Sequence, residues 1–344
     1  MKRLQEYDFP EDLKNMPENE LELLSYEIRD FLIEKVSRSG GHLASNLGVV
    51  ELSIAIHRVF DSPKDKIIWD VGHQAYVHKI LTGRADRFDS LRALDGISGF
   101  PRTTESPHDM HDSGHASTSL SIASGYAAAR DLSGENGEVI AIIGDGAMTG
   151  GVAFEALNNA GSSHSKLIVI LNDNEMSIDK NGGGLSQHFR KLRSSKTYIE
   201  FKKQLKKVLK GVPGVGDSLY SSAEHIRDIL KYALINGTVF DSFGFKYFGP
   251  IDGHDIHELI EAFNLAKILE GPILLHVVTK KGKGYKNAEC NPGRFHGISP
   301  FDPTTGVLRS SQDKPAYSLI AGEKLLNLAR HDDRTVEGDD GAAY

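Results

Sequence analysis

The sequence has almost none of the features of a secreted or membrane protein. It has a single cysteine, Cys290, so no disulfide can form within the chain. No run approaches the ~20 apolar residues of a membrane span, and the N-terminus lacks the apolar stretch of a signal peptide. The net charge of −7 gives no reason to expect a nucleic acid as the main partner. We therefore expect a soluble, cytoplasmic protein.

The composition is that of a folded chain. Hydrophobic residues make up 39% of the 344 positions and charged residues 25%, which excludes a disordered composition. This length fits one large domain or two ordinary ones.

Apolar runs alternate with helical patterns along the chain. Residues 18–36 have apolar side chains at helical spacing, 117–132 read as a helix rich in small residues, and 151–161 as a helix that ends at a glycine. Strand-like apolar runs begin the segments "KIIWDVGHQAY", "EVIAIIGDG", "KLIVILNDNEM" and "ILLHVVTKKGKG". Strand, helix and strand in succession form a βαβ unit. The sequence thus predicts an α/β fold with a mostly parallel sheet, helices on both faces and a ligand site at the carboxyl ends of the strands.

A carboxylate stands directly after one of these strands. In "EVIAIIGDGAMTGG", Asp145 follows an apolar run and lies between two glycines. Glycines allow close approach of a phosphate, and the helix that follows adds partial positive charge at its N-terminus. The next strand ends in Asn172, Asp173 and Asn174, so adjacent strands would present carboxylate and amide oxygens, as Mg²⁺ prefers. Gly-Asp-Gly alone is also common turn chemistry, but its place in a βαβ unit favours a metal and diphosphate site.

The motifs of this chain resemble those of a known enzyme family. They include "SGGHLASNLGVVELSIAIHRVF", "IIWDVGHQAYVHKILTGR", "SGHASTSLSIASGYAAARD", "GDGAMTGGVAFEALNNAG", "LNDNEMSI", "FGPIDGHD", "TKKGKGY" and "FHGISPFDP". Over roughly residues 10–305 the chain is similar to the 1-deoxy-D-xylulose-5-phosphate synthases among the transketolase-like enzymes. The resemblance implies thiamine diphosphate, Mg²⁺, a homodimer, and a decarboxylating condensation of pyruvate with glyceraldehyde 3-phosphate.

The resemblance also implies roles for single residues. The metal ligands would be Asp145, Asn174 and the backbone carbonyl of Met176. The cofactor would be bound by His73, Gly114, His115, Ala116, Ser117, Gly146, Ala147, Asn174 and Lys281. The catalytic histidines would be His42, His73 and His296. From the residues alone, a surface lysine remains an alternative for Lys281, with Lys280 as the fallback if the register at "KK" is shifted.

Three further features of the sequence could have a function of their own. The histidines of "HDMHDSGH" (108–115) have a spacing that would allow zinc, but no cysteine or helical pattern supports such a site. Cys290 has no evident base partner and is interpreted as incidental. Residues 182–236 interrupt the alternation and contain a strongly basic stretch, read either as anion-binding or as a solvated helix face. We expect this segment to be a mobile insertion near the mouth of the site.

The resemblance covers only the first part of such a synthase. We expect a cofactor-binding domain over 1–313, with 314–344 as the partly disordered start of a second domain. The family's second domain carries the glutamate that activates the aminopyrimidine, and no segment here resembles it. Three interpretations stay open: a truncated synthase with weak activity alone, one subunit of a split transketolase-like enzyme completed by a separate chain, or a non-catalytic diphosphate-binding module.

Overall fold

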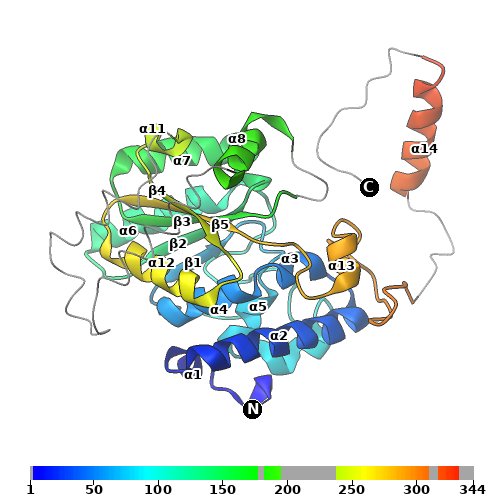
Figure 1. Ribbon diagram of the computed structural model, residues 1–344, viewed down its shortest axis with the longest axis horizontal. Helices are drawn as coiled ribbons and strands as arrows, with labels where there is room; N and C mark the ends of the chain where they lie inside the picture. The colour runs from blue at the N-terminus through cyan, green and yellow to red at the C-terminus, as the bar shows by residue number, and fades with distance from the viewer. Residues whose placement is uncertain (1–2, 177–181, 195–237, 310–316, 333–344) are drawn as a thin grey trace.

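The computed structural model describes residues 3–176, 182–194, 238–309 and 317–332. Within them the chain builds one parallel sheet with helices on both faces (Figure 1). The strand order is β1-β2-β3-β5-β4. The strands are β1 (Lys66–Trp69), β2 (Val139–Gly144), β3 (Leu167–Asp173), β4 (Lys246–Asp252) and β5 (Pro272–Val278). The predicted fold class is confirmed.

Helices flank the sheet and connect its strands. They are α1 (Glu11–Lys14), α2 (Glu18–Ser39), α3 (Leu43–Leu47), α4 (Val50–Val59), α5 (Tyr76–Lys79), α6 (Ser119–Ser133), α7 (Gly151–Ser163), α8 (Gly183–Ser194), α11 (Val239–Ser242), α12 (Ile256–Ile268), α13 (Lys286–Cys290) and α14 (Tyr317–Ala329). The helices expected over 18–36, 117–132 and 151–161 correspond to α2, α6 and α7. In the part of the chain that the structure describes, no helix has both the length and the apolar character to cross a membrane.

Alternate strand residues supply the cores on the two faces of the sheet. In β2, Ile140 and Ile142 pack with residues of α4 and α12, while Ala141 and Ile143 pack with residues of α6 and α7. Figure 1 shows α7 on one side of the sheet and α4 and α12 on the other. A third apolar cluster joins α2, α3, α4 and α5. Because helices cover both faces, the carboxyl edge of the sheet is where a ligand has access to strand ends.

The predicted βαβ unit is present, and one strand was not predicted. β2 and β3 are neighbours joined through α7, with Gly144 opposite Asn172. The unpredicted strand is β4, at the edge of the sheet, whose pairing with β5 shifts between Phe248 and Ile251. Gly249 and Pro250 stand at that shift, and such residues interrupt the pattern by which a strand is recognised.

Two predictions fall partly outside the described residues. Of the insertion expected over 182–236, the structure describes only 182–194, most of which forms α8. Of the second-domain start expected over 314–344, it describes 317–332. There the helical pattern "YSLIAGEKLLNLAR" is confirmed as α14, which buries none of its residues. The predicted mobility and domain boundary stay predictions.

A chain of buried polar side chains runs from α4 through α5 to the loop at Asp109. His57 Nε2 lies 2.9 Å from His78 Nδ1, and His78 Nε2 lies 3.0 Å from Asp109 Oδ1. All three side chains are buried. Asp109 is ionised: burial alone would raise its pKa, but hydrogen bonds from His78 and Arg84 hold that pKa well below its usual value. The carboxylate fixes the tautomers, so His78 donates from Nε2 and accepts from His57.

Two buried cations complete this cluster. Arg84 Nη1 lies 2.8 Å from Asp109 Oδ2 and 2.9 Å from Glu105 Oε1, and Lys79 pairs with Glu105. The two carboxylates also accept backbone N–H groups from both ends of the 98–102 stretch, at 2.8 and 2.9 Å. The cluster therefore fixes the loop that carries Phe100 toward the candidate site.

Candidate active site

The carboxyl ends of β2, β3 and β5 are joined by hydrogen bonds. The Asp145 N–H donates to the Asn172 carbonyl at 3.2 Å, which extends the ladder one step past β2. Thr279 donates its hydroxyl to Asn172 Oδ1 at 2.6 Å and its N–H to the Asp173 carbonyl at 3.0 Å. Asp145 itself is buried. The expected carboxylate thus lies at the strand edge beside the end of β3.

The loop after β3 is held in a defined conformation. Asn174 Oδ1 accepts the Met176 N–H at 3.0 Å, a turn typical of asparagine. Between them, Glu175 has a φ of 65°. Arg193 of α8 pairs with both Asp173 and Glu175. The segment predicted to supply two metal ligands is therefore fixed from both sides, by the sheet and by α8.

A buried carboxylate at the end of β1 joins two loops of the site. Asp70 accepts the N–H groups of Ser117 and Ser119, at 2.9 and 3.0 Å. Ser117 in turn donates its hydroxyl to the Ala147 carbonyl at 2.7 Å. The approach is so close that a Cβ on Gly150 would lie 2.2 Å from Ser117 Oγ. The loop at Ser117 and the loop after β2 therefore form one wall.

Backbone strain collects in the loops of this edge. Val71, Ser117 and Glu175 have φ values of 58°, 70° and 65°, in the left-handed region that residues other than glycine rarely adopt. For Val71 the branched side chain makes this conformation especially unfavourable. Such strain persists only where the surroundings impose it, and it is concentrated at functional sites.

Replacing Asp70 by asparagine is expected to loosen this wall. One carboxylate accepts two N–H groups, and an amide brings a donor into the place of one acceptor. We expect a loss of about 1–3 kcal/mol in the free energy of unfolding, measured by denaturant titration, and faster amide exchange at Ser117 and Ser119. Asp131→Asn, at an exposed site of α6, is the matched control. Equal stability of the two variants would contradict the role given to Asp70.

The three predicted catalytic histidines form a triangle. The ring centroids of His42 and His73 lie 5.5 Å apart, those of His42 and His296 5.5 Å, and those of His73 and His296 5.1 Å. The Phe100 ring packs edge-on against His42 at 5.6 Å. Residues from three separate parts of the sequence thus converge on one point.

Asn46 positions two of these histidines and was not predicted to do so. Its side-chain amide donates to the carbonyls of His42 and His73 at 2.6 and 2.8 Å, and its Oδ1 accepts the Tyr76 N–H at 2.8 Å. The Tyr76 hydroxyl accepts the His42 N–H at 3.3 Å. Asn46 is fully buried, so every polar group of its amide is used to hold the backbone beneath the triangle.

The histidines of the triangle are neutral near pH 7. Burial, with the charges of Arg92 and Lys281, lowers the pKa of His42 to about 4. Burial, Lys281 and His42 lower the pKa of His296 to about 3. Burial and the neighbouring histidines lower the pKa of His73 well below its ordinary value. Neutral imidazoles can both donate and accept hydrogen bonds, as proton transfer requires.

Lys281 connects the triangle to the strand end. Its side chain is buried, and burial lowers its pKa to about 8 although the charge of Asp145 opposes the shift. Its own charge lowers the pKa of all three histidines. Lys280 instead is exposed and pairs with Glu289 at 2.6 Å. The geometry therefore favours Lys281 over Lys280 as the lysine of the site.

The triangle has unused hydrogen-bonding capacity. In the described part of the chain, the Nδ1 atoms of His42, His73 and His296 are all buried and lack a hydrogen-bond partner. The same holds for Gln74 Oε1 and Ser113 Oγ on nearby loops. Buried polar atoms are normally paired, so this concentration is typical of a site whose partner is a polar ligand.

Stability is expected to fall as the pH drops below about 6.5. The folded-state pKa values of His42 and His296, and of the fully buried His57 and His78, are lowered, so only the unfolded chain takes up these protons. His57 and His78 together contribute a slope of up to about 3 kcal/mol per pH unit, at roughly 1.4 for each proton. Denaturant titrations at pH 7, 6 and 5 measure the effect, and a flat free energy of unfolding would contradict it.

Comparison with known proteins identifies the family. The family model described as 1-deoxy-D-xylulose-5-phosphate synthase matches residues 4–279. The chain belongs to the 1-deoxy-D-xylulose-5-phosphate synthase family. It is 52% identical over 97% of its length to the 1-deoxy-D-xylulose-5-phosphate synthase of Alkaliphilus oremlandii, and 53% identical over 97% to that of Caldanaerobacter subterraneus subsp. tengcongensis. The match covers 54% and 53% of these proteins, so this synthase-family chain spans about half the length of the curated relatives it matches.

Solved structures confirm the fold of the synthase-family chain. Transketolase from Campylobacter jejuni matches with a TM-score of 0.60 and 18% identity, over 85% of this chain and 44% of that one. Transketolase from Leishmania mexicana matches with a TM-score of 0.55 and 18% identity, over 92% and 48%. At these identities the likeness concerns the fold alone.

The remaining predicted residues lie in the loops around this edge of the synthase-family fold. Gly146 and Ala147 are half-buried at the start of a short turn that leads into α7. Gly114, His115 and Ala116 are exposed, immediately before the buried Ser117. Their roles toward a cofactor, like those of all the predicted site residues, stay predictions.

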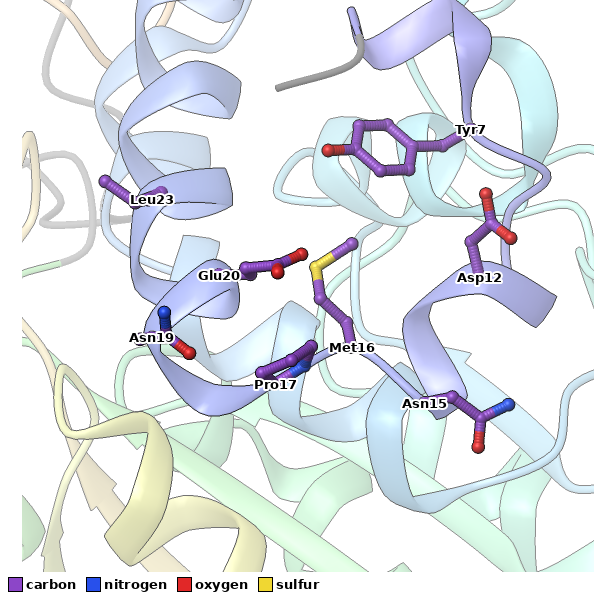
Figure 2. A pocket seen from close by; sticks show the side chains of 8 residues that line it. All are labelled: Tyr7, Asp12, Asn15, Met16, Pro17, Asn19, Glu20 and Leu23. Atoms are coloured by element: carbon purple, nitrogen blue, oxygen red, sulfur yellow. The ribbon is translucent and has the colours of Figure 1, made fainter.

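The structure also describes the histidine-rich segment 108–115 and a hollow away from the strand ends. His108 Nδ1 lies 3.0 Å from Ser62 Oγ, and the described residues contain no group of three or more His, Cys, Asp or Glu suited to a metal. A hollow of about 640 Å³ lies between α1 and α2, with Met16 on its floor (Figure 2). Figure 2 shows Tyr7 and Glu20 on opposite sides of it. It contains none of the strand-end residues, so it is not the active site of the synthase fold.

Proposed function

We propose that this chain is the diphosphate-binding part of a thiamine-diphosphate-dependent 1-deoxy-D-xylulose-5-phosphate synthase. The observation that carries the proposal is the continuity of the site. Three neutral, unsatisfied histidines lie near one buried lysine, and that lysine interacts with the strand-end Asp145. One end of such a site suits a metal-bound diphosphate, and the other suits proton transfer to an uncharged ring or carbonyl.

In this proposal the strand ends bind the diphosphate end of the cofactor. Mg²⁺ would be bound by Asp145, Asn174 and the Met176 carbonyl, and oxygen ligands of this kind match its preference. The backbone at Gly146 and Ala147 would hold the diphosphate. Further contacts come from the loops beside it, through Gly114, His115, Ala116, Ser117, His73, Asn174 and Lys281. The short turn and α7 after Asp145 add a helix N-terminus to the anion site.

The histidine triangle serves the reacting end. When bound, thiamine diphosphate supplies the carbanion chemistry that joins a pyruvate-derived unit to glyceraldehyde 3-phosphate. His42 and His296 hold neutral imidazoles at the substrate side, where they bind oxygen atoms and move protons. Phe100 and the buried setting of the rings keep water away. A homodimer, a cytoplasmic location and a separate chain that completes the site remain parts of the proposal.

The decisive experiment is calorimetric titration of the 344-residue chain with thiamine diphosphate. Binding is expected in the presence of Mg²⁺ and a large loss of affinity is expected in EDTA, because Asp145, Asn174 and the Met176 carbonyl would hold Mg²⁺ and its charge would favour the diphosphate. A product assay with pyruvate and glyceraldehyde 3-phosphate, with and without the second half of a relative added, then tests turnover separately. Absence of any cofactor binding with Mg²⁺ would contradict the proposed function.

A further inference from the structure

The loop that carries Lys281 is fixed by backbone hydrogen bonds to three different elements. Residues 279–284 follow β5, and the Thr279 N–H donates to the carbonyl of Asp173 at the end of β3. The Gly282 N–H donates to the Ala44 carbonyl of α3 at 2.8 Å. Between these two points, the Lys280 N–H donates to a side chain, His254 Nε2, at 2.8 Å. The residue next to Lys281 thus depends on a histidine from another part of the chain.

His254 lies in the motif "FGPIDGHD", between β4 and α12, and both of its ring nitrogens have partners. Nε2 accepts the Lys280 N–H, so the ring proton is on Nδ1, which donates to Glu51 Oε2 at 3.1 Å. Only a neutral imidazole can link a backbone N–H to a carboxylate in this way. The ring therefore transmits the position of Glu51 to the loop.

Glu51 is itself anchored by a buried arginine. Arg29 of α2 lies 2.6 Å from Glu51 Oε1, and both side chains are buried. Burial would raise the pKa of Glu51, but hydrogen bonds from His254 and Arg29 lower it, so the carboxylate stays ionised. Arg29 Nε also donates to the Lys283 carbonyl at 3.1 Å. The contacts through His254, Glu51 and Arg29 thus form a closed network that begins at Lys280 and ends at Lys283.

We propose that His254 is a positioning residue for Lys281, and that the hydrogen-bonded network of Arg29, Glu51 and His254 holds the 280–283 stretch in place. This inference rests on the proposed function for what Lys281 binds, a phosphate group of the cofactor. The hydrogen bond to His254 holds the Lys280 N–H at a fixed point. Lys281 is then buried toward the site, while the Lys280 side chain points outward to Glu289. Without His254 the loop loses its contact next to Lys281 and keeps those at Thr279 and Gly282.

Two substitutions at His254 separate its two contacts. An asparagine amide reaches the place of Nδ1 and can donate to Glu51, but it is too short to accept the Lys280 N–H. A glutamine reaches the place of Nε2 and can accept that N–H through Oε1. His254→Asn should therefore free the loop, and His254→Gln should retain much of the wild-type behaviour.

The test measures amide exchange without cofactor, and then cofactor affinity with Mg²⁺. Exchange of the Lys280 amide is expected to be at least about 10-fold faster in His254→Asn and near wild type in His254→Gln. Thiamine diphosphate affinity is expected to fall by about 10–100-fold in the first variant, as for partners that orient ligand-binding residues, and to be largely kept in the second. Lys281→Met sets the largest loss that mispositioning of Lys281 can cause.

The outcomes are distinguishable from failure of the proposed function. Unchanged exchange in His254→Asn, or equal exchange in the two variants, would overturn the positioning role. So would faster exchange with no loss of affinity in a chain whose Lys281→Met variant does lose affinity. If the wild-type chain binds no cofactor, the proposed function fails, while the exchange measurement still decides whether His254 holds the loop. Denaturant midpoints for both variants establish that the comparison is made between folded chains.

Discussion

Asp109→Ala is expected to lower the free energy of unfolding by about 3–5 kcal/mol, because it leaves buried charges without their partner. Arg84 Nη1 lies 2.8 Å from the Asp109 carboxylate, and Lys79 Nζ lies 3.9 Å from it. His78 donates to the same group at 3.0 Å. Glu105 remains to pair with Arg84 and Lys79, but one carboxylate cannot balance two buried cations.

Asp112→Ala is the matched control for this prediction. Asp112 lies three positions further along the same loop, and its carboxylate accepts the N–H and hydroxyl of Thr103 at an exposed site. Its loss is expected to change the free energy of unfolding by less than about 1.5 kcal/mol. Denaturant titration of both variants measures the difference. A difference of under about 1 kcal/mol between them would show that the cluster around Asp109 does not stabilise the fold as argued.

Asp109→Ala is also expected to affect the candidate active site. Asp109 accepts the Arg102 N–H at 2.9 Å, and the stretch it fixes places Phe100 against the His42 ring. Loss of the carboxylate should therefore uncover His42 as well as destabilise the chain. Since burial is the main cause of the lowered His42 pKa, that pKa should rise from about 4 toward its ordinary value in Asp109→Ala.

Local pattern was enough to predict the centre of the sheet and not its edge. β2 is an apolar run that ends in Gly144, β3 is apolar up to Leu171, and the link through α7 makes the two strands neighbours. β4 has Gly249 and Pro250 in its middle, and it keeps its strand form because β5 pairs with it on both sides of the register shift. That support comes from a partner distant in sequence, which no local pattern reports.

The strand-end rule located carboxylates of the site without separating their tasks. Asp145 and Asp70 both stand directly after apolar strands. Asp70 is used to accept two backbone N–H groups of the loop at Ser117, and this depends on where that loop returns. The role of Asn46 could not be predicted for the same reason, because its partners at His42, His73 and Tyr76 become neighbours only in the folded chain.

The prediction of His42, His73 and His296 as site residues depended on the family resemblance. His42, His73 and His296 follow no shared spacing, and His296 in particular stands in a stretch without a recognisable pattern. The convergence of their rings within 5.5 Å is a property of the tertiary fold. What the residues alone could indicate was narrower: His73 follows a strand end, and His42 lies next to glycines where a packed histidine is unusual.

Asp145→Ala is expected to reduce the affinity for thiamine diphosphate in Mg²⁺ by at least about 100-fold. Loss of a residue that merely orients a metal ligand costs about 10–100-fold, and loss of a charged ligand should exceed this. Asp145 is the buried carboxylate at the end of β2, and Asn174 and Met176 provide only uncharged oxygens. Without the carboxylate, the metal would lose the charge that holds it at the strand edge.

The dependence of the affinity on Mg²⁺ tests this prediction more directly than the affinity alone. In the wild-type chain, calorimetry should give a high affinity with Mg²⁺ and a low one in EDTA. In Asp145→Ala the two affinities should be equal, and both should match the wild-type value in EDTA. Glu155→Ala removes the same charge from an exposed site on α7 and should leave the wild-type pattern intact. Because Asp145 also interacts with Lys281, the variant's unfolding midpoint must show a folded chain. A folded Asp145→Ala chain that still binds the cofactor more tightly with Mg²⁺ than in EDTA would show that the metal is held by other residues.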